Sequence, residues 1–190
     1  MTRFALLVVD MINDFFDHHG ELAEQRVGLT TSINALIRQF RHHAQPVVWV
    51  RQEFAADLSD AFLDMRKRGA RVAIAGTEGC RILSELDQEP SDTTIIKKRY
   101  SAFFGTTLDD TLLALRPGRL VITGVNTHAC VRATVIDAYQ RDYEVIVASE
   151  GTASYDPDHH AITRRYLDGK IARFLSNVEI LEMLNDARAV

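Results

Sequence analysis

Short runs that are apolar throughout recur along this chain and alternate with longer amphipathic stretches. Five are clear, at residues 4–9, 46–50, 93–96, 119–123 and 144–148; residues 177–181 form a candidate sixth, and residues 71–74 a short extra piece. A strand with one face in water alternates apolar and polar residues, whereas a strand covered on both faces is apolar throughout. The runs therefore predict the strands of a parallel sheet with helices on both faces.

Helical patterns lie between these runs, at about residues 27–43, 106–115, 129–139 and 156–171. Such strand–helix alternation with short connections predicts right-handed β-α-β units. The expected fold class is α/β: a three-layer, doubly wound, mostly parallel sheet of about six strands with helices on both faces. No linker divides the chain, so residues 1–190 are expected to form a single domain in which the looser segment 52–92 covers a site.

The composition excludes several classes of protein. Of the 190 residues, 46% are hydrophobic and 25% charged, which is ordinary for a globular protein and argues against disorder. The 22 Lys and Arg against 26 Asp and Glu give a net charge of −4, which argues against a nucleic-acid partner. No apolar run reaches the roughly 18 residues of a membrane span, two cysteines are too few for a disulfide scaffold, and the apolar start lacks a cleavage site. We expect a cytoplasmic protein without membrane contact.

Three reactive side chains follow the predicted strands at their carboxyl ends, where ligands of open parallel sheets collect. They are Asp10, Lys97 or its neighbour Lys98, and Cys130. A carboxylate, an ammonium group and a thiol in one place form the pattern of covalent catalysis. Cys130 is expected in the first turn of a helix, where free N–H groups favour a thiolate and can receive an oxyanion.

Each of these residues also has an ordinary structural explanation. A lone cysteine is more often a small buried hydrophobic residue, and Cys80 keeps that interpretation. An Asp at a strand end is often a turn residue, and a pair of lysines is usually solvated. The combination of the three, rather than any one member, carries the hypothesis.

Four segments that span most of the chain carry a resemblance to a known family. They are LLVVDMINDF at 6–15, PVVWVR at 46–51, KKRYSAFFGT at 97–106 and TGVNTHACV at 123–131. With these motifs the chain resembles the isochorismatase-like cysteine hydrolase superfamily, which includes nicotinamidases, N-carbamoyl-amino-acid amidases, ureidoacrylate hydrolases and isochorismatase itself.

The resemblance implies a site and an assembly. Its catalytic residues would be Asp10, Lys97 and Cys130, with Lys97 preferred to Lys98 because the family lysine stands two places before the Arg of the Arg-Tyr-Ser-Ala-Phe motif. A non-proline cis peptide bond would join Val125 and Asn126, and the backbone N–H groups of Ala129 and Cys130 would form the oxyanion hole. The family also commonly forms homo-oligomers, so a dimer or tetramer is expected.

Three comparisons with the family pattern bear on the expected reaction. Ile12 stands where many relatives have Gln, so a polar contact near the triad is missing. True isochorismatases lack the nucleophilic cysteine, so Cys130 favours hydrolysis of an amide or ureide C–N bond. Nicotinamidases usually add an Asp and two His that hold a metal, but the candidate segment from Glu53 to Asp64 contains no histidine.

The other candidate site residues are histidines and aromatic residues. Six of the seven histidines form adjacent pairs whose side chains diverge, so neither a metal site nor a cofactor is expected. His128 could either line the pocket or face solvent, and the sequence does not distinguish these two placements. The candidates for the pocket wall are Phe15, Phe104, His128 and Tyr155.

The sequence thus predicts a cysteine-dependent hydrolase that cleaves a C–N bond of a small amide, carbamoyl or ureido substrate through a thioester. A nicotinamidase-type pyridine amide hydrolase and a non-catalytic binding subunit remain alternatives. A nucleotide- or flavin-binding domain has little support, because the first strand–helix turn has no Gly-x-Gly-x-x-Gly and no Walker sequence occurs.

Overall fold

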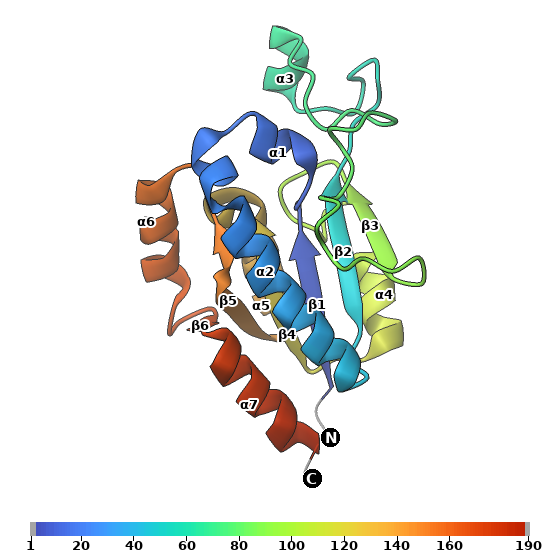
Figure 1. The fold of residues 1–190 in the computed structure, drawn as a ribbon. Coiled ribbons are helices and arrows are strands. Elements are labelled where there is room, and N and C mark those ends of the chain that lie inside the picture. The colour runs from blue at the N-terminus through green and yellow to red at the C-terminus, as the bar shows by residue number, and fades with distance from the viewer. Residues whose placement is uncertain (1–2, 189–190) are drawn as a thin grey trace.

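The computed structural model describes residues 3–188, which fold around one parallel sheet (Figure 1). Six strands lie in the order β3-β2-β1-β4-β5-β6, and every neighbouring pair is parallel. The strand order reverses beside β1, as in other doubly wound folds. The strands are β1 (Phe4–Val9), β2 (Val47–Gln52), β3 (Thr93–Lys97), β4 (Arg119–Val125), β5 (Glu144–Ala153) and β6 (Arg173–Leu175).

Helices cover both faces of the sheet and so form the two outer layers. Alternate residues of β1 enter two separate cores: Leu6 and Val8 pack with α2 and α7, whereas Leu7 and Val9 pack with α4 and α5. This two-sided burial is the reason that the strand sequences are apolar throughout. The helices are α1 (Asn13–Asp17), α2 (Gly20–His42), α3 (Leu63–Arg68), α4 (Leu108–Leu115), α5 (Arg132–Tyr139), α6 (Pro157–Leu167) and α7 (Asn177–Arg188), with a single π-helical turn, η1 (Thr127–Val131), before α5.

The predicted α/β class and the first five strands are confirmed, but the proposed strand at 177–181 is wrong. A capping box starts α7 instead: the Ser176 N–H donates to the Glu179 carboxylate, and the Glu179 N–H donates back to Ser176 Oγ. The sixth strand is the short β6 just before it. Residues 71–74 contribute only an isolated bridge, between Phe54 and Ile74.

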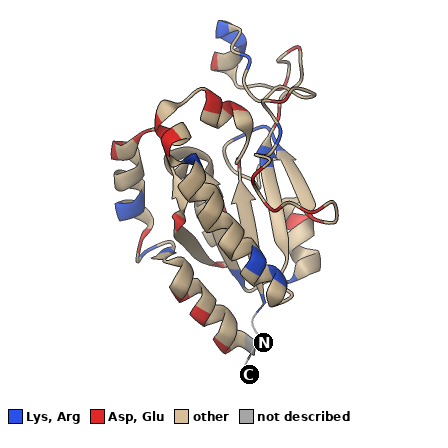
Figure 2. Ribbon diagram, viewed as in Figure 1, with Lys and Arg blue, Asp and Glu red and all other residues tan. Residues whose placement is uncertain are grey.

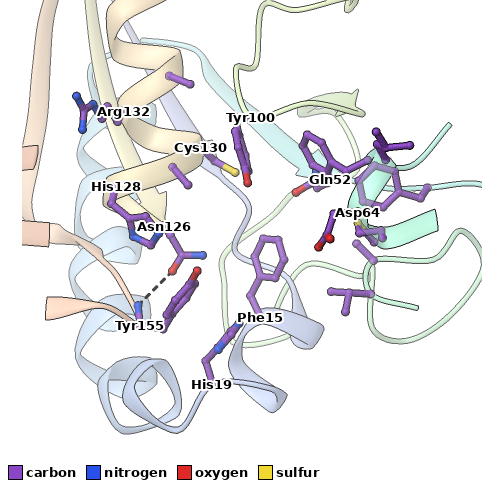
Figure 3. A pocket seen from close by; sticks show the side chains of 18 of the residues that line it. Phe15, His19, Gln52, Asp64, Tyr100, Asn126, His128, Cys130, Arg132 and Tyr155 are labelled. Carbon is purple, nitrogen blue, oxygen red and sulfur yellow. Dashed lines mark hydrogen bonds between the residues drawn. The ribbon is translucent and has the colours of Figure 1, made fainter. Parts of the chain in front are cut away.

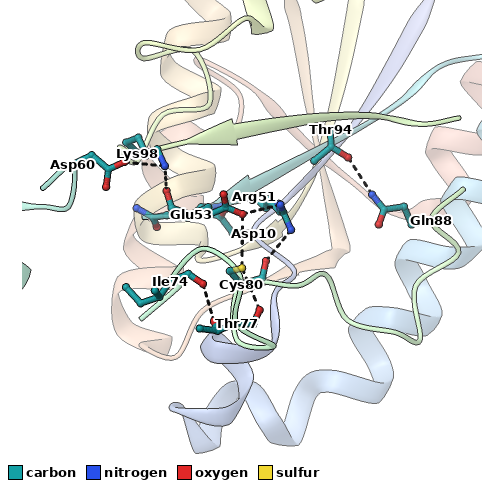
Figure 4. A network of polar contacts seen from close by, with 11 residues as sticks. Asp10, Arg51, Glu53, Asp60, Ile74, Thr77, Cys80, Gln88, Thr94 and Lys98 are labelled. Carbon is teal, nitrogen blue, oxygen red and sulfur yellow. Dashed lines mark hydrogen bonds and ion pairs between the residues drawn. The ribbon is translucent and has the colours of Figure 1, made fainter. Parts of the chain in front are cut away.

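The segment between β2 and β3 leaves the sheet and returns, and α3 lies on its outermost part (Figure 1). It has a small core of its own, to which Phe54, Ile74 and Cys80 belong. Polar contacts join this segment to the ends of β2 and β3 (Figure 4): Arg51 pairs with Glu53, and Cys80 Sγ donates to the same carboxylate. The segment is therefore ordered, and it stands at the carboxyl end of the sheet.

Charged residues of both signs are spread over several helices and loops (Figure 2). α3 alone carries Asp64 together with Arg66, Lys67 and Arg68. Within residues 3–188, no helix combines the length and the apolar character needed to cross a membrane.

Gly124, near the end of β4, allows β1 and β4 to approach closely. Its φ of 107° is unfavourable for residues with a side chain, and a Cβ there would overlap the carbonyl oxygen of Val9. We expect Gly124→Ala to lower the free energy of unfolding by about 3 kcal/mol, from backbone strain plus the steric clash. Urea denaturation followed by circular dichroism measures the change.

Gly28→Ala is the matched control, because Gly28 is exposed within α2 and a Cβ there meets nothing within 4 Å. It should raise the free energy of unfolding by about 0.5–1 kcal/mol, since alanine restricts the unfolded chain and favours helix. Equal stability of the two variants would contradict this account of Gly124.

Candidate active site

Three buried side chains from separate strand ends meet at the carboxyl edge of the sheet. Asp10 directly follows β1, Lys97 ends β3, and Cys130 lies in η1, after β4. Lys97 Nζ lies 2.6 Å from Asp10 Oδ2 and donates to Cys130 Sγ over 3.3 Å. Because β2 separates β3 from β1, and neighbouring strands are about 4.8 Å apart, only a long side chain can make this connection from β3.

The two oxygens of the Asp10 carboxylate have different partners. Oδ1 accepts a hydrogen bond of 2.7 Å from the backbone N–H of Gln52, on β2. Oδ2 has the ion pair with Lys97 and, among the described residues, no hydrogen-bond partner. A buried acceptor with spare capacity next to a thiol is placed to take up a proton.

The structure distinguishes the two adjacent lysines. Lys97 points inward and is fully buried, and its Nζ also donates to the carbonyl of Arg99. Lys98 points the opposite way, where its Nζ pairs with Asp60 at 3.0 Å and donates to the carbonyl of Glu53 (Figure 4). The alternation of side chains along β3 therefore places only Lys97 beside Asp10 and Cys130.

The thiol of Cys130 is protonated at neutral pH. Burial raises the pKa of Cys130 to about 12; the negative charge of Asp10 adds to this rise, and the positive charge of Lys97 opposes it. Cys130 lies in η1, which continues directly into α5, so it is near the start of a helix as expected; burial and the Asp10 carboxylate oppose the thiolate that this helix end favours. Although burial lowers the pKa of Lys97, its contacts with Asp10 and Cys130 outweigh that effect and raise the pKa, so the lysine is charged.

The turn before Cys130 has the expected cis peptide bond between Val125 and Asn126. The N–H groups of Ala129 and Val131 both donate to the carbonyl of Asn126, over 3.0 and 3.2 Å. One of the two N–H groups expected in the oxyanion hole, that of Ala129, is therefore already engaged. The side-chain oxygen of Asn126 accepts from the Tyr155 N–H, and its nitrogen faces the cavity (Figure 3).

A cavity of about 990 Å³ opens directly onto Cys130 (Figure 3). Asp10 and Lys97 lie behind its wall, so Cys130 is the member of the buried trio that a bound molecule would touch. The wall combines aromatic residues from the sheet edge with residues of the segment between β2 and β3. Its aromatic residues are Phe15, Phe54, Phe62, Tyr100 and Tyr155.

Of the four residues predicted for the pocket wall, the structure places Phe15, His128 and Tyr155 in it. Phe104 is the exception: it does not line the cavity, and its side chain is 64% exposed. The neighbouring Phe103 takes the buried position in the core beneath α4, which turns Phe104 outward.

Several lining residues were missed from the sequence. Gln52 is the last residue of β2 and Tyr100 follows β3, so the strand-end rule could have indicated them. His19 stacks on Tyr155, with ring centroids 4.2 Å apart, although His19 directly precedes α2 and Tyr155 follows β5, far away in the sequence. No signal in the sequence pointed to this contact.

His128 is half-buried in the cavity wall. Its Nδ1 lies 2.6 Å from Ser154 Oγ, and its ring meets Tyr155 edge to face. Burial lowers the pKa of His128, so the ring is neutral near pH 7.

Residues 3–188 hold no group of three or more His, Cys, Asp or Glu side chains that could bind a metal, so the residues at this site do not fit a metal ion.

The sequence and the fold of this chain are similar to those of known proteins. The sequence pattern described as Isochorismatase domain matches residues 4–177. A protein of Arabidopsis thaliana named probable inactive nicotinamidase is 34% identical over 174 residues, which cover 87% of each chain. Enterobactin synthase component B of Escherichia coli is 29% identical over 181 residues, which are 94% of this chain but only 62% of that protein. The solved structure of N-carbamoylsarcosine amidase from Thermoplasma acidophilum has 31% identity and a TM-score of 0.74, covering 90% of this chain and 96% of that chain.

The contacts of Cys130 predict how its acidity responds to substitution. Asp10→Asn removes the negative charge but leaves Lys97 at 3.3 Å from the sulfur, so the pKa of Cys130 should fall below its parental value of about 12, although burial still raises it. The pH dependence of iodoacetamide alkylation measures it, in a Cys80→Ala background so that only Cys130 reacts.

Asp60→Asn serves as the control, because it removes a carboxylate that pairs with Lys98 and leaves Cys130's contacts intact. Its alkylation profile should match that of the parent. A pKa for Cys130 that is the same in Asp10→Asn and in the parent would contradict the coupling.

Proposed function

The chain belongs to the isochorismatase family of hydrolases, and on this premise we propose that it cleaves a C–N bond of a small amide, carbamoyl or ureido compound through Cys130. The observation that carries the proposal is the buried Asp10–Lys97 pair in contact with a thiol that opens onto a cavity. A base, a nucleophile and a fixed positive charge within hydrogen-bond reach are the elements of nucleophilic catalysis.

In the first step, Asp10 Oδ2 accepts the thiol proton as Sγ attacks the substrate carbonyl carbon. Because the pKa of Cys130 is about 12, proton transfer has to accompany the attack rather than precede it. The new C–S bond gives a tetrahedral oxyanion. Backbone N–H groups of Ala129 and Cys130 are the proposed donors to it, and Ala129 would share its hydrogen between the oxyanion and the Asn126 carbonyl.

In the second step, the tetrahedral intermediate expels the nitrogen. Asp10 returns its proton to the departing nitrogen, so that ammonia or an amine leaves and a thioester remains on Cys130. A water molecule then attacks the thioester and loses its proton to Asp10, which delivers that proton to the sulfur. The sum is one amide plus one water giving one acid plus one amine.

Lys97 takes no proton in this scheme. Its positive charge pairs with the Asp10 carboxylate and compensates the negative charge on sulfur as the thiol proton moves. It also fixes the two groups relative to each other, because its single ammonium group contacts both.

The relatives support this class of reaction and leave an alternative to test. N-carbamoylsarcosine amidase, as its name says, acts on an N-carbamoyl compound, which is one of the proposed substrate classes. The relative named probable inactive nicotinamidase keeps open a nicotinamidase type of activity and a non-catalytic binding role. An ammonia-release screen over primary amides including nicotinamide, carbamoyl amino acids and ureides separates these possibilities.

Substitution of the nucleophile is the decisive test. On any substrate that the screen identifies, Cys130→Ala should lower kcat by about 10³-fold or more, since the covalent route is lost. Mass spectrometry of the quenched parent protein should detect an acyl adduct on Cys130.

Cys80→Ala is the matched control, because Cys80 belongs to the small core between β2 and β3 and does not line the cavity. It should retain turnover. If Cys130→Ala turned over the same substrate at the parental rate, the proposed mechanism would be wrong.

A further inference from the structure

The part of the cavity next to Cys130 is apolar. Phe15, Tyr100 and Tyr155 lie around the cavity near Cys130 (Figure 3), and Met65 and Val72 also line it. An apolar or aromatic body placed here would leave water, which stabilises a complex by roughly 25 cal/mol for each Å² buried.

Among the described residues that line the cavity, only Asp64 and Arg132 carry a formal charge near pH 7, and neither is placed to bind a substrate group beside Cys130. The guanidinium of Arg132 lies over the ring of Tyr166, 4.9 Å from its centroid, and its side chain points away from the cavity (Figure 3). Asp64 is exposed on α3 and pairs with Arg68 at 3.1 Å.

Four cations lie behind or beside the wall, and each already has a partner. Lys97 pairs with Asp10, Lys98 with Asp60, and Arg51 with Glu53. Arg99 donates to the carbonyls of Asp60 and Lys98 and covers the ring of Phe62. Three of these four cations are therefore neutralised by a carboxylate, whereas Arg99 has only neutral partners among the described residues and does not line the cavity.

Apart from the Asp64 carboxylate, the polar side chains that face the cavity are neutral. Gln52 is 4% exposed, and its side-chain nitrogen has no hydrogen-bond partner among the described residues. The nitrogen of Asn126 also faces the cavity, and burial lowers the pKa values of His19 and His128. Neutral donors satisfy a carbonyl or amide, but they do not offset the cost of burying a carboxylate, which is several kcal/mol without a cation.

We propose that the substrate is an uncharged carboxamide with an apolar or aromatic body, and that carboxylate-bearing carbamoyl and ureido acids are excluded by the absence of a cation facing the cavity. The inference rests on the proposed function and narrows the proposed substrates by their charge. It concerns the charge of the bound molecule, so it is testable apart from turnover.

Two alkylating agents of nearly equal size test the charge preference directly. Iodoacetamide is a neutral carboxamide and iodoacetate its anionic counterpart, and both form the same bond to sulfur with loss of iodide. In the Cys80→Ala protein, the ratio of the iodoacetamide rate to the iodoacetate rate at Cys130 should be at least about tenfold higher in the folded chain than in the same chain unfolded in urea, which corresponds to about 1.4 kcal/mol. A folded ratio equal to or below the unfolded ratio would overturn the proposal.

Variants of the wall test whether charge is the cause. Met65→Arg places a cation in the wall and should reduce the ratio severalfold, whereas the matched Met65→Leu should keep it. Arg132→Gln should also keep the ratio, because Arg132 points away from the cavity. A marked rise of the ratio in Arg132→Gln would show that Arg132 attracts anions to the cavity, which contradicts the proposal.

A pair of substrates separates failure of this inference from failure of the proposed function. Terephthalamide and its half-acid differ only in that one carboxamide is replaced by a carboxylate. We expect kcat/KM for the diamide to exceed that for the half-acid by about tenfold or more. Faster, Cys130-dependent hydrolysis of the half-acid would overturn the inference and leave the function standing, whereas hydrolysis that persists in Cys130→Ala would overturn the function itself.

Discussion

The ion pair between Asp10 and Lys97 is the interaction on which the site depends. Two opposite charges are fully buried here, which is costly unless each compensates the other. Their meeting requires β1, β2 and β3 to end in register, because Lys97 reaches across β2 and the Gln52 N–H of that strand holds the second carboxylate oxygen. The sheet therefore acts as a frame that fixes a charge pair, and the thiol of Cys130 is added to it from the turn after β4.

The catalytic groups and the cavity wall follow different rules of construction. Asp10, Lys97 and Cys130 come from strand ends and one adjoining turn, so their positions are set by the pairing of the sheet. Much of the wall comes from the segment between β2 and β3, whose position depends on its own small core and on polar contacts with strand ends. This division explains why the buried charges of Asp10 and Lys97 are kept out of the cavity: of the three reactive groups, only the sulfur of Cys130 reaches the wall.

The same division explains which features could be predicted from the sequence. Two-sided burial made β1, β2, β4 and β5 visible as apolar runs, whereas β3 is an edge strand in which only Ile95 and Lys97 are buried. The strand-end rule found the three reactive residues. β6 was missed because three residues are too few to show a pattern, and the capping box at Ser176 and Glu179 converted the next apolar run into α7. Phe62, Met65 and the stacking of His19 on Tyr155 depend on how distant segments fold against one another, which local pattern does not record. The expected homo-oligomer stays a prediction.

The excursion between β2 and β3 has a consequence for how such a protein can change. Its two ends are anchored at the sheet, but its outermost part, with α3, projects beyond the strands (Figure 1). Insertions and deletions in surface segments cost little as long as the anchors remain. Selection or a designer can therefore exchange residues 55–72 to remodel the size and polarity of the binding chamber, while the bond-breaking machinery on the strand ends is inherited unaltered.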